Sequence, residues 1–451
     1  MTFSQLRKKY PRFIYRNYSY RISNEDLEIS FYFRIEPNIK FSPKLIIKNI
    51  NHDKLARINK KVLDNLVFHL GLIESISYWK ATCSPEIKIE SGYLDKKQIA
   101  WWKDLIINGM GQFFYENRID FRNKDFLKIN SLKKQSLAKH TGRVQNKEIL
   151  VPIGGGKDSI VTLELLKQNQ KKINCFSLNP TLAAQKVMRV GKCKNPIIIR
   201  RSIDKRLLEL NRKGFLNGHT PFSAYLAFLS VLLGVLFDYQ DIAFSNERSS
   251  NEGNVKYLGR IINHQYSKSF DFEEKFRNYS KKYLSNAVEY FSLLRPFYEI
   301  QIAKLFSYLP EYFSVFLSCN KSSKWCCSCP KCLFVFMSLY PFVENKELVK
   351  IFGKDLFKDK NLLPVMKELI GQRKFKPFEC VGTQKESLAA LYLGWKKAKQ
   401  ENTKLPYLLK YFEENILPKY KTLGKDSQGI MNSRNDQHNI PKLLTKSSKR
   451  I

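Results

Sequence analysis

The stretch ILVPIGGGKDSIVTLELL, residues 149–166, decides how the central part of this chain folds. It opens with the apolar run of a buried strand, and from Ser159 onward its apolar residues have helical spacing. Between the two, the glycines at 154–156 leave backbone amides free to surround an anion at the start of the helix. The pattern predicts a phosphate-binding loop. The alternative is an ordinary strand-to-helix turn capped by Asp158 or Ser159.

Strand-like and helix-like segments alternate on both sides of this loop. The expected strands are EILVPI (148–153), INCFSL (173–178), NPIIIRRSI (195–203) and DIAFSN (241–246). Helices are expected from Ser159, around Ala183 and over 224–239. This alternation predicts an α/β domain, a doubly wound parallel sheet with helices on both faces.

The remainder of the chain divides by its hydrophobic period. Alternating apolar residues over 13–50 predict a small antiparallel sheet, and helical spacing dominates 55–126. At 451 residues the chain is too long for one ordinary core. We therefore expect an α+β N-terminal domain at 1–145, the doubly wound domain at 146–345, a helical C-terminal part at 346–420 and a disordered basic tail at 421–451.

Composition narrows the partners and the compartment. The chain has 78 Lys and Arg against 41 Asp and Glu, a formal net charge of +37, which favours either a polyanionic partner or simply a lysine-rich proteome. Because the basic residues are spread along the chain, no nucleic-acid partner is expected. The N-terminus lacks the apolar core of a secretory signal, and the apolar stretch 224–239 is short for a membrane span. A cytoplasmic protein without membrane contact is expected.

The nine cysteines are expected to be reduced thiols, because no export signal precedes them. Four of them are spaced C-x6-C-x2-C-x2-C, at Cys319, Cys326, Cys329 and Cys332. Four thiolates this close predict a tetrahedral structural zinc site without an open catalytic position; the alternative is four thiols without metal. Three others are expected to be small core or loop residues: Cys83, Cys175 and Cys193.

The loop GGGKDS resembles the S-G-G-x-D-S loop of the PP-loop ATP pyrophosphatases, which have an adenine nucleotide alpha hydrolase-like fold. These enzymes split ATP between its α and β phosphates and transfer AMP to an acceptor. The resemblance implies that ATP and Mg²⁺ are bound by Gly154, Gly155, Gly156, Lys157, Asp158 and Ser159. The chain departs from the family pattern at Gly154, where serine is usual, which removes one hydroxyl contact to phosphate.

Further blocks resemble the UDP-N-acetylmuramoyl-L-alanyl-L-glutamate epimerases of bacterial wall synthesis. They include SYWKA (77–81), LNGHTP (216–221), FSNERS (244–249), NHQYSKS (263–269), YFSLLRP (290–296), WCCSCPKCLFVF (325–336) and KPFECVG (376–382). The resemblance implies ATP-dependent epimerisation of the terminal L-Glu of UDP-MurNAc-L-Ala-L-Glu to D-Glu through an acyl-adenylate, with release of AMP and diphosphate. It also implies a role in peptidoglycan and cell wall biogenesis, and so in cell shape and cell division.

This chemistry needs a proton acceptor and a proton donor on opposite faces of one carbon atom. The candidates in the matching blocks are His219, His264, Glu247, Lys268 and Cys380, with Glu247 also a candidate magnesium ligand. Two arginines suit substrate phosphate or carboxylate groups, Arg248 and Arg295. The alternatives are hydrogen-bonded structural histidines, a packed cysteine, and solvated or ion-paired cations.

Two other classes of function remain open. The loop, the cysteines and the charge also fit another adenylating PP-loop enzyme, one that modifies tRNA or forms amides. The glycine in place of serine fits a nucleotide-binding regulator that has lost its chemistry. For the epimerase, the N-terminal domain is expected to recognise the UDP-sugar end of the substrate; the oligomeric state is not indicated.

Overall fold

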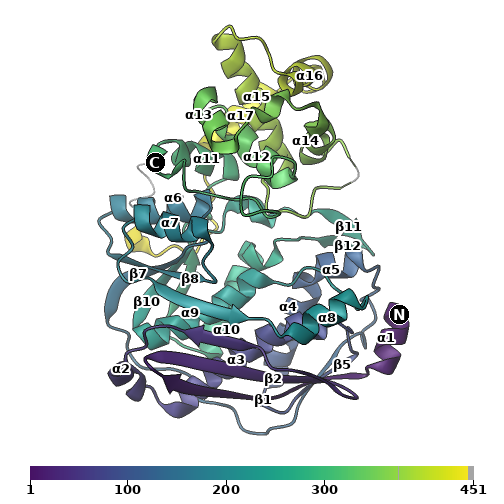
Figure 1. The fold of residues 1–451 in the computed structure, drawn as a ribbon, viewed down its shortest axis with the longest axis vertical. Coiled ribbons are helices and arrows are strands. Elements are labelled where there is room, and N and C mark those ends of the chain that lie inside the picture. Colours follow the sequence, from purple (N-terminus) through teal and green to yellow (C-terminus); the bar gives the residue numbers. More distant parts are fainter. Residues whose placement is uncertain (374, 445–451) are drawn as a thin grey trace.

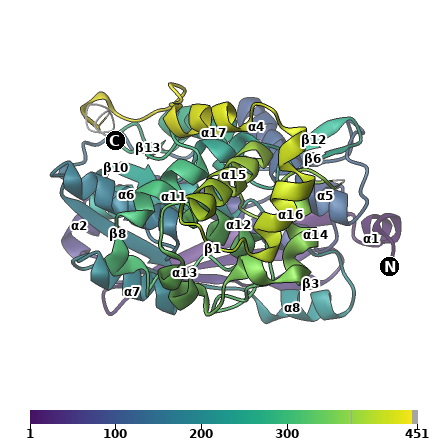
Figure 2. The same ribbon diagram turned by 90° about the horizontal axis from the view of Figure 1, so that it is seen from above.

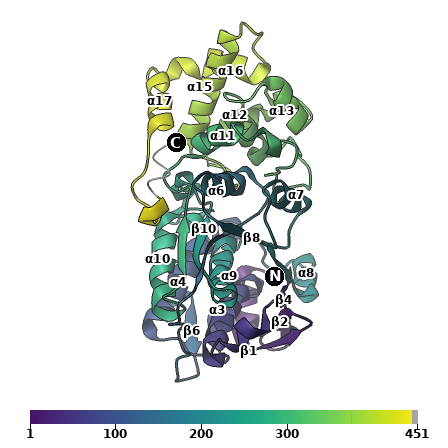
Figure 3. The same cartoon turned by 90° about the vertical axis from the view of Figure 1, so that its left-hand side faces the viewer.

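The computed structural model describes residues 1–373 and 375–444. Figure 1 shows the N-terminal strands at one end of the long axis, the strands of the central part in the middle, and the C-terminal helices at the other end. Figure 3 shows the same three levels from the side, with α6 and α7 between the central strands and the C-terminal helices, and α9 and α10 on the other side of those strands. The helices of the described residues that precede the C-terminal group have the following bounds: α1 Phe3–Lys9, α2 His52–Ala56, α3 Lys60–Trp79, α4 Lys96–Gly109, α5 Gly111–Glu116, α6 Lys157–Gln168, α7 Leu182–Val190, α8 Lys205–Arg212, α9 Phe222–Phe237 and α10 Phe270–Tyr283.

One mixed sheet runs through the molecule. Within the described residues it has 11 strands, in the order β13-β10-β7-β8-β9-β4-β2-β1-β5-β6, with β3 paired to β2. Its strands are β1 Arg12–Ser23, β2 Asp26–Ile35, β3 Ile39–Phe41, β4 Lys44–Ile47, β5 Glu86–Ile89, β6 Lys128–Ser131, β7 Asn146–Pro152, β8 Ile173–Leu178, β9 Ile197–Ser202, β10 Tyr239–Phe244 and β13 Glu289–Ser292. A separate antiparallel ribbon consists of β11 Val255–Tyr257 and β12 Arg260–Ile262.

The central half of the sheet is parallel. β13, β10, β7, β8 and β9 are neighbours in that order, and each pair runs parallel. The four strands expected around the glycine loop are β7, β8, β9 and β10, and the expected helices are α6, α7 and α9. The predicted α/β class with a large parallel sheet is thus confirmed.

The N-terminal strands pair antiparallel, as the alternation over 13–50 predicts. They also extend the central sheet, because β4 pairs with β9 and places Ile47 opposite Ile199. The boundary expected at residue 145 therefore falls inside a continuous sheet. Beyond β1, the strands β5 and β6 are parallel additions at the far edge.

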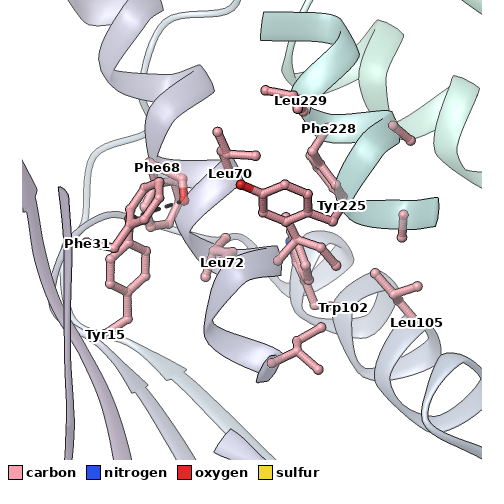
Figure 4. Packing of buried hydrophobic residues seen from close by; sticks show 14 of the residues in the cluster. Tyr15, Phe31, Phe68, Leu70, Leu72, Trp102, Leu105, Tyr225, Phe228 and Leu229 are labelled. Atoms are coloured by element: carbon pink, nitrogen blue, oxygen red, sulfur yellow. Dashed lines mark hydrogen bonds between the residues drawn. The ribbon is translucent and has the colours of Figure 1, made fainter. Parts of the chain in front are cut away.

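A shared core joins the two parts of the chain. Figure 4 shows side chains from the N-terminal strands and from α3, α4 and α9 packed together: Tyr15, Phe31, Phe68, Leu70, Leu72, Trp102, Leu105, Tyr225, Phe228 and Leu229. The rings of Trp102 and Phe228 stack with centroids 5.1 Å apart. The apolar stretch 224–239 thus forms a buried helix, α9, as expected. Among the described residues, no helix is long and apolar enough to cross a membrane.

The C-terminal helices form a second cluster with its own core. In Figure 2, seen from above, α15, α16 and α17 lie in front of the rest of the molecule. The helices of this group are α11 Glu299–Ser307, α12 Pro330–Leu339, α13 Asn345–Phe352, α14 Leu363–Leu369, α15 Gln384–Gln400, α16 Tyr407–Asn415 and α17 Leu423–Asn432. Of these, α13 to α16 cover much of the range 346–420, where a helical part is expected.

Two expectations need correction. Disorder from residue 421 is wrong for α17, because Leu423 and Ser427, one helical turn apart, give the polar segment a face that is buried in this cluster. The expected tail beyond residue 444 lies outside the described residues. Reduced thiols are wrong for Cys175 and Cys193, which form a disulfide; β8 and the chain after α7 bring their Cα atoms to 6.0 Å, within disulfide range.

Candidate active site

The glycine loop follows β7, the strand at which the order of strand addition in the sheet reverses. After β7 the chain continues to β8 and β9 on one side and later returns to β10 on the other side of β7. In parallel α/β sheets this switch point opens a crevice at the carboxyl ends of the strands, where ligands bind. Gly156 is the N-cap of α6 and has no side chain to occupy the free amides of that helix. The loop therefore has the position and the donors of an anion site.

The loop glycines differ in what their backbone requires. Gly155 has φ +91°, and a Cβ there would lie 2.7 Å from the backbone nitrogen of Ala184. Only glycine fits such a position. A Cβ on Gly154 would meet nothing within 4 Å, so the serine usual in PP-loop proteins has room at this position.

Three carboxylates meet beside the loop, each following a different strand. Asp158 lies in the first turn of α6 after β7, Glu247 follows β10, and Glu299 opens α11 after β13. One oxygen of each lies within 4.8 Å of the others, and the two glutamates are at most 2 % exposed. Carboxylate oxygens in a compact set are the donors that Mg²⁺ prefers, so this triad fits the expected magnesium.

Buried cations balance part of this negative charge. Lys157 is 1 % exposed and pairs with both Asp158 and Glu299, while the Nζ of Lys331 lies 3.6 Å from Glu299. Burial works against charge on Glu299, but Lys157 and Lys331 outweigh it and lower its pKa. Burial raises the pKa of Glu247 to about 7, and the charge of Glu299 adds to the shift. Glu247 is therefore the member of the triad poised to hold a proton near neutral pH.

Four of the expected proton-transfer residues form a second cluster. The rings of His219 and His264 lie 4.5 Å apart, and His264 Nε2 is 3.9 Å from the Cys380 sulfur. The Nζ of Lys268 donates to the same sulfur at 3.3 Å. Burial and then the positive charge of Lys268 lower the pKa of His264 to about 4. The imidazole is therefore neutral at physiological pH.

Lys268 connects this cluster to the triad. Burial opposes its charge, but Cys380, Glu247 and Asp158 together raise its pKa. His219 is held neutral in the same way as His264, because burial and the neighbouring cations lower its pKa to about 3. Its Nε2 is buried without a hydrogen-bond partner among the described residues, which leaves one polar atom free for a ligand.

The two arginines expected to bind substrate make their contacts within the protein. Arg295 is fully buried, pairs with Glu273 at 3.0 Å and donates to the backbone oxygens of Glu247 and Lys268. It holds the backbone of the site in place and is covered from substrate. Arg248 lies over the ring of Tyr298, at 4.2 Å from its centroid, and donates to the Ser433 hydroxyl at 3.4 Å.

The cysteine quartet assembles as its spacing predicts. The sulfurs of Cys319, Cys326, Cys329 and Cys332 all lie within 4.8 Å of one another, as a tetrahedral zinc site requires. Cys327 lies outside the set and points its thiol at the backbone oxygen of Phe352. Four thiols are the donor set that zinc prefers, so the residues fit this metal.

The segment that carries the quartet also touches the glycine loop. The backbone nitrogen of Leu317 donates to the oxygen of Gly155 at 2.9 Å. Lys331, between two of the cysteines, contacts Glu299 and donates to the backbone oxygen of Cys380. The segment is therefore in direct contact with the anion loop, the carboxylate triad and the second cluster.

Sequence reasoning missed Glu299 and Lys331. Glu299 follows the YFSLLRP block by three residues and starts a helix after a strand, which is the signal that places it at the sheet edge. Lys331 lies inside the cysteine motif, where it reads as a solvated cation. Only the fold shows that it is 5 % exposed and faces the triad.

Fold and site together define an α/β protein with an anion-binding loop and a carboxylate triad at the carboxyl ends of its parallel strands. Comparison with family models refines this class: the MurL N-terminal domain matches residues 4–293 and the MurL C-terminal domain matches residues 315–420. The chain belongs to the MurL family, which confirms the resemblance seen in the sequence blocks.

Three curated relatives that share one name match over most of their length. A UDP-N-acetyl-alpha-D-muramoyl-L-alanyl-L-glutamate epimerase from Xanthomonas oryzae pv. oryzae is 32% identical over 407 residues, 86% of this chain and 87% of the relative. Proteins of the same name from Salinispora tropica and Micromonospora sp. are each 34% identical and cover 73% and 72% of this chain, and 74% and 73% of themselves.

Proposed function

We propose that this protein converts the terminal L-glutamate of UDP-MurNAc-L-Ala-L-Glu to D-glutamate in peptidoglycan precursor synthesis, using ATP and releasing AMP and diphosphate. The observation that carries the proposal is the family match, which spans the loop, the second cluster, the cysteine quartet and two of the three triad carboxylates, Asp158 and Glu247. The site supports it by placing an anion loop beside a set of proton-transfer groups.

Activation explains why such a reaction needs a nucleotide. The Cα proton next to a free carboxylate is very hard to remove, because the resulting carbanion would lie beside a full negative charge. Joining the carboxylate to AMP removes that charge and gives a carbonyl that accepts the electrons as an enolate. A side-chain base can then take the proton, and return of a proton to the other face inverts the centre.

Each group of residues has a part in this scheme. The amides at Gly154–Gly156 would bind the phosphates, as in the PP-loop proteins that the loop resembles, and the buried Lys157 ammonium, paired with Asp158 and Glu299, would add positive charge beside them. Asp158, Glu247 and Glu299 would hold magnesium, which neutralises phosphate charge when bound. The cysteine quartet would hold a structural zinc that fixes the segment against the loop.

The second cluster supplies the proton-transfer groups. Cys380 and Lys268, in contact at 3.3 Å, lie beside the neutral His264. Inversion of the stereocentre requires a proton acceptor and a proton donor on opposite faces of the substrate Cα.

An assay with defined products tests the proposal. Purified protein is incubated with UDP-MurNAc-L-Ala-L-Glu, ATP and magnesium, and glutamate chirality and nucleotide products are measured. We expect D-glutamate and AMP, and loss of both in Asp158→Asn. Folded protein that yields no D-glutamate, or that yields ADP, would contradict the proposal. AMP release that depends on tRNA would instead support the other adenylating class, which the loop, the cysteines and the charge of +37 also fit.

A further inference from the structure

A short chain of polar side chains leads from helix α5 to the second cluster. The amide oxygen of Gln112 lies 2.5 Å from Nδ1 of His264, and its amide nitrogen donates to Glu116 at 2.7 Å. On the other side of the imidazole, Nε2 faces the Cys380 sulfur at 3.9 Å. None of the sequence motifs that match the epimerases includes α5.

The direction of each hydrogen bond follows from the chemistry of the groups. A carboxylate only accepts hydrogen bonds, so the side of Gln112 that faces Glu116 must be its NH₂ group. The amide oxygen then faces His264, and because it also only accepts, Nδ1 must carry the hydrogen. A neutral imidazole has one N–H, so Nε2 is left with a lone pair toward the thiol.

The charged groups around His264 keep the ring neutral. Lys268 and Lys376 lower its pKa beyond the effect of burial, and Glu116 acts in the opposite sense. The ring of His219, itself neutral, lies 4.5 Å from that of His264, centroid to centroid. With the ring neutral, its tautomer is the property that the neighbours can set.

We propose that Gln112 is a positioning residue that fixes His264 as the Nδ1–H tautomer and so directs the Cys380 thiol hydrogen toward Nε2. Lys268 donates to the sulfur from another direction, so the thiol has one defined orientation at the site. The importance of Gln112 for catalysis rests on the proposed function. The tautomer of His264 does not depend on that function.

The tautomer is observable by NMR in protein labelled with ¹⁵N-histidine. His264→Asn identifies the His264 signals, and their ¹⁵N shifts show which ring nitrogen carries hydrogen. We expect Nδ1–H in the wild type and a mixture in Gln112→Met, with kcat for epimerisation about 10²-fold lower and KM unchanged. The exposed Gln400→Met serves as the matched control, with the wild-type kcat and tautomer.

Exchanging the side chains of Gln112 and Glu116 distinguishes an effect of Gln112 on the His264 tautomer from an effect on packing alone. In the double variant Gln112→Glu with Glu116→Gln, the new carboxylate accepts from both neighbours, so Nδ1–H and most of the activity should return. An Nε2–H tautomer in the wild type, or an unchanged tautomer in Gln112→Met, would overturn the inference. Wild-type protein with Nδ1–H but without epimerase activity would support the tautomer and contradict the proposed function alone.

Discussion

Two adjacent glycines in the anion loop place opposite demands on a side chain. At Gly155 the backbone is left-handed and a Cβ would collide with Ala184, whereas the space beside Gly154 is open. We therefore expect Gly155→Ala to raise the KM for ATP at least about tenfold, since strain and collision together exceed about 1.4 kcal/mol. Gly154→Ala and Gly154→Ser should stay within about twofold. The KM for ATP is measured by steady-state kinetics with detection of AMP. Equal increases in KM for Gly154→Ala and Gly155→Ala would contradict this loop geometry.

Arg295 is expected to affect stability more than substrate affinity. Arg295→Met leaves the Glu273 carboxylate, which is also fully buried, without its partner. Breaking a buried pair in this way destabilises by about 3–5 kcal/mol. Thermal unfolding should show a large fall in Tm, and adding Glu273→Gln should restore part of it. If Arg295→Met instead has the wild-type Tm and a raised KM for the UDP-muramoyl dipeptide, Arg295 binds substrate and this prediction is wrong.

At the scale of single elements, the cysteine segment between α11 and α12 depends on its quartet. We expect one zinc per chain by elemental analysis, and loss of that zinc in Cys326→Ser. Because this segment bonds to Gly155 through Leu317, ATP affinity should fall together with the metal content. Cys327→Ser is the matched control, since its thiol lies outside the quartet and should leave zinc in place. Wild-type protein free of zinc after purification without chelators would refute the metal site.

The sequence predicts those elements that are encoded by a pattern of neighbouring residues, such as an apolar run or a regular spacing of cysteines. The parallel strands and α9 follow from apolar runs, and the quartet follows from spacing alone. The disulfide does not, because the proximity of Cys175 and Cys193 arises only when α7 packs against the sheet. The tail was also mispredicted, since α17 is stabilised by its contacts with α15 and not by its own composition.

At the scale of the whole molecule, local periodicity could not predict how far the sheet extends. The change from alternating to helical spacing of apolar residues shows where strands give way to helices along the chain. It contains no signal that β4 pairs with β9. Likewise, the sequence blocks identified Glu247, His264 and Cys380, while only the fold brought Glu299 and Gln112 beside them. Contacts between segments far apart in sequence are the part of a site that pattern reasoning misses.

The continuous sheet predicts that the two parts of the chain do not fold independently. A fragment of residues 146–451 would leave β9 without β4 and would expose the face of α9 that packs on α3 and α4 (Figure 4). Each large apolar side chain left in water forfeits about 1.5–3 kcal/mol, against a typical total stability of about 5–15 kcal/mol. We expect this fragment alone to aggregate or to show no cooperative thermal transition by circular dichroism. Co-expression with residues 1–145 should restore a soluble complex that forms AMP, whereas cooperative unfolding of the isolated fragment would show that the shared core is dispensable.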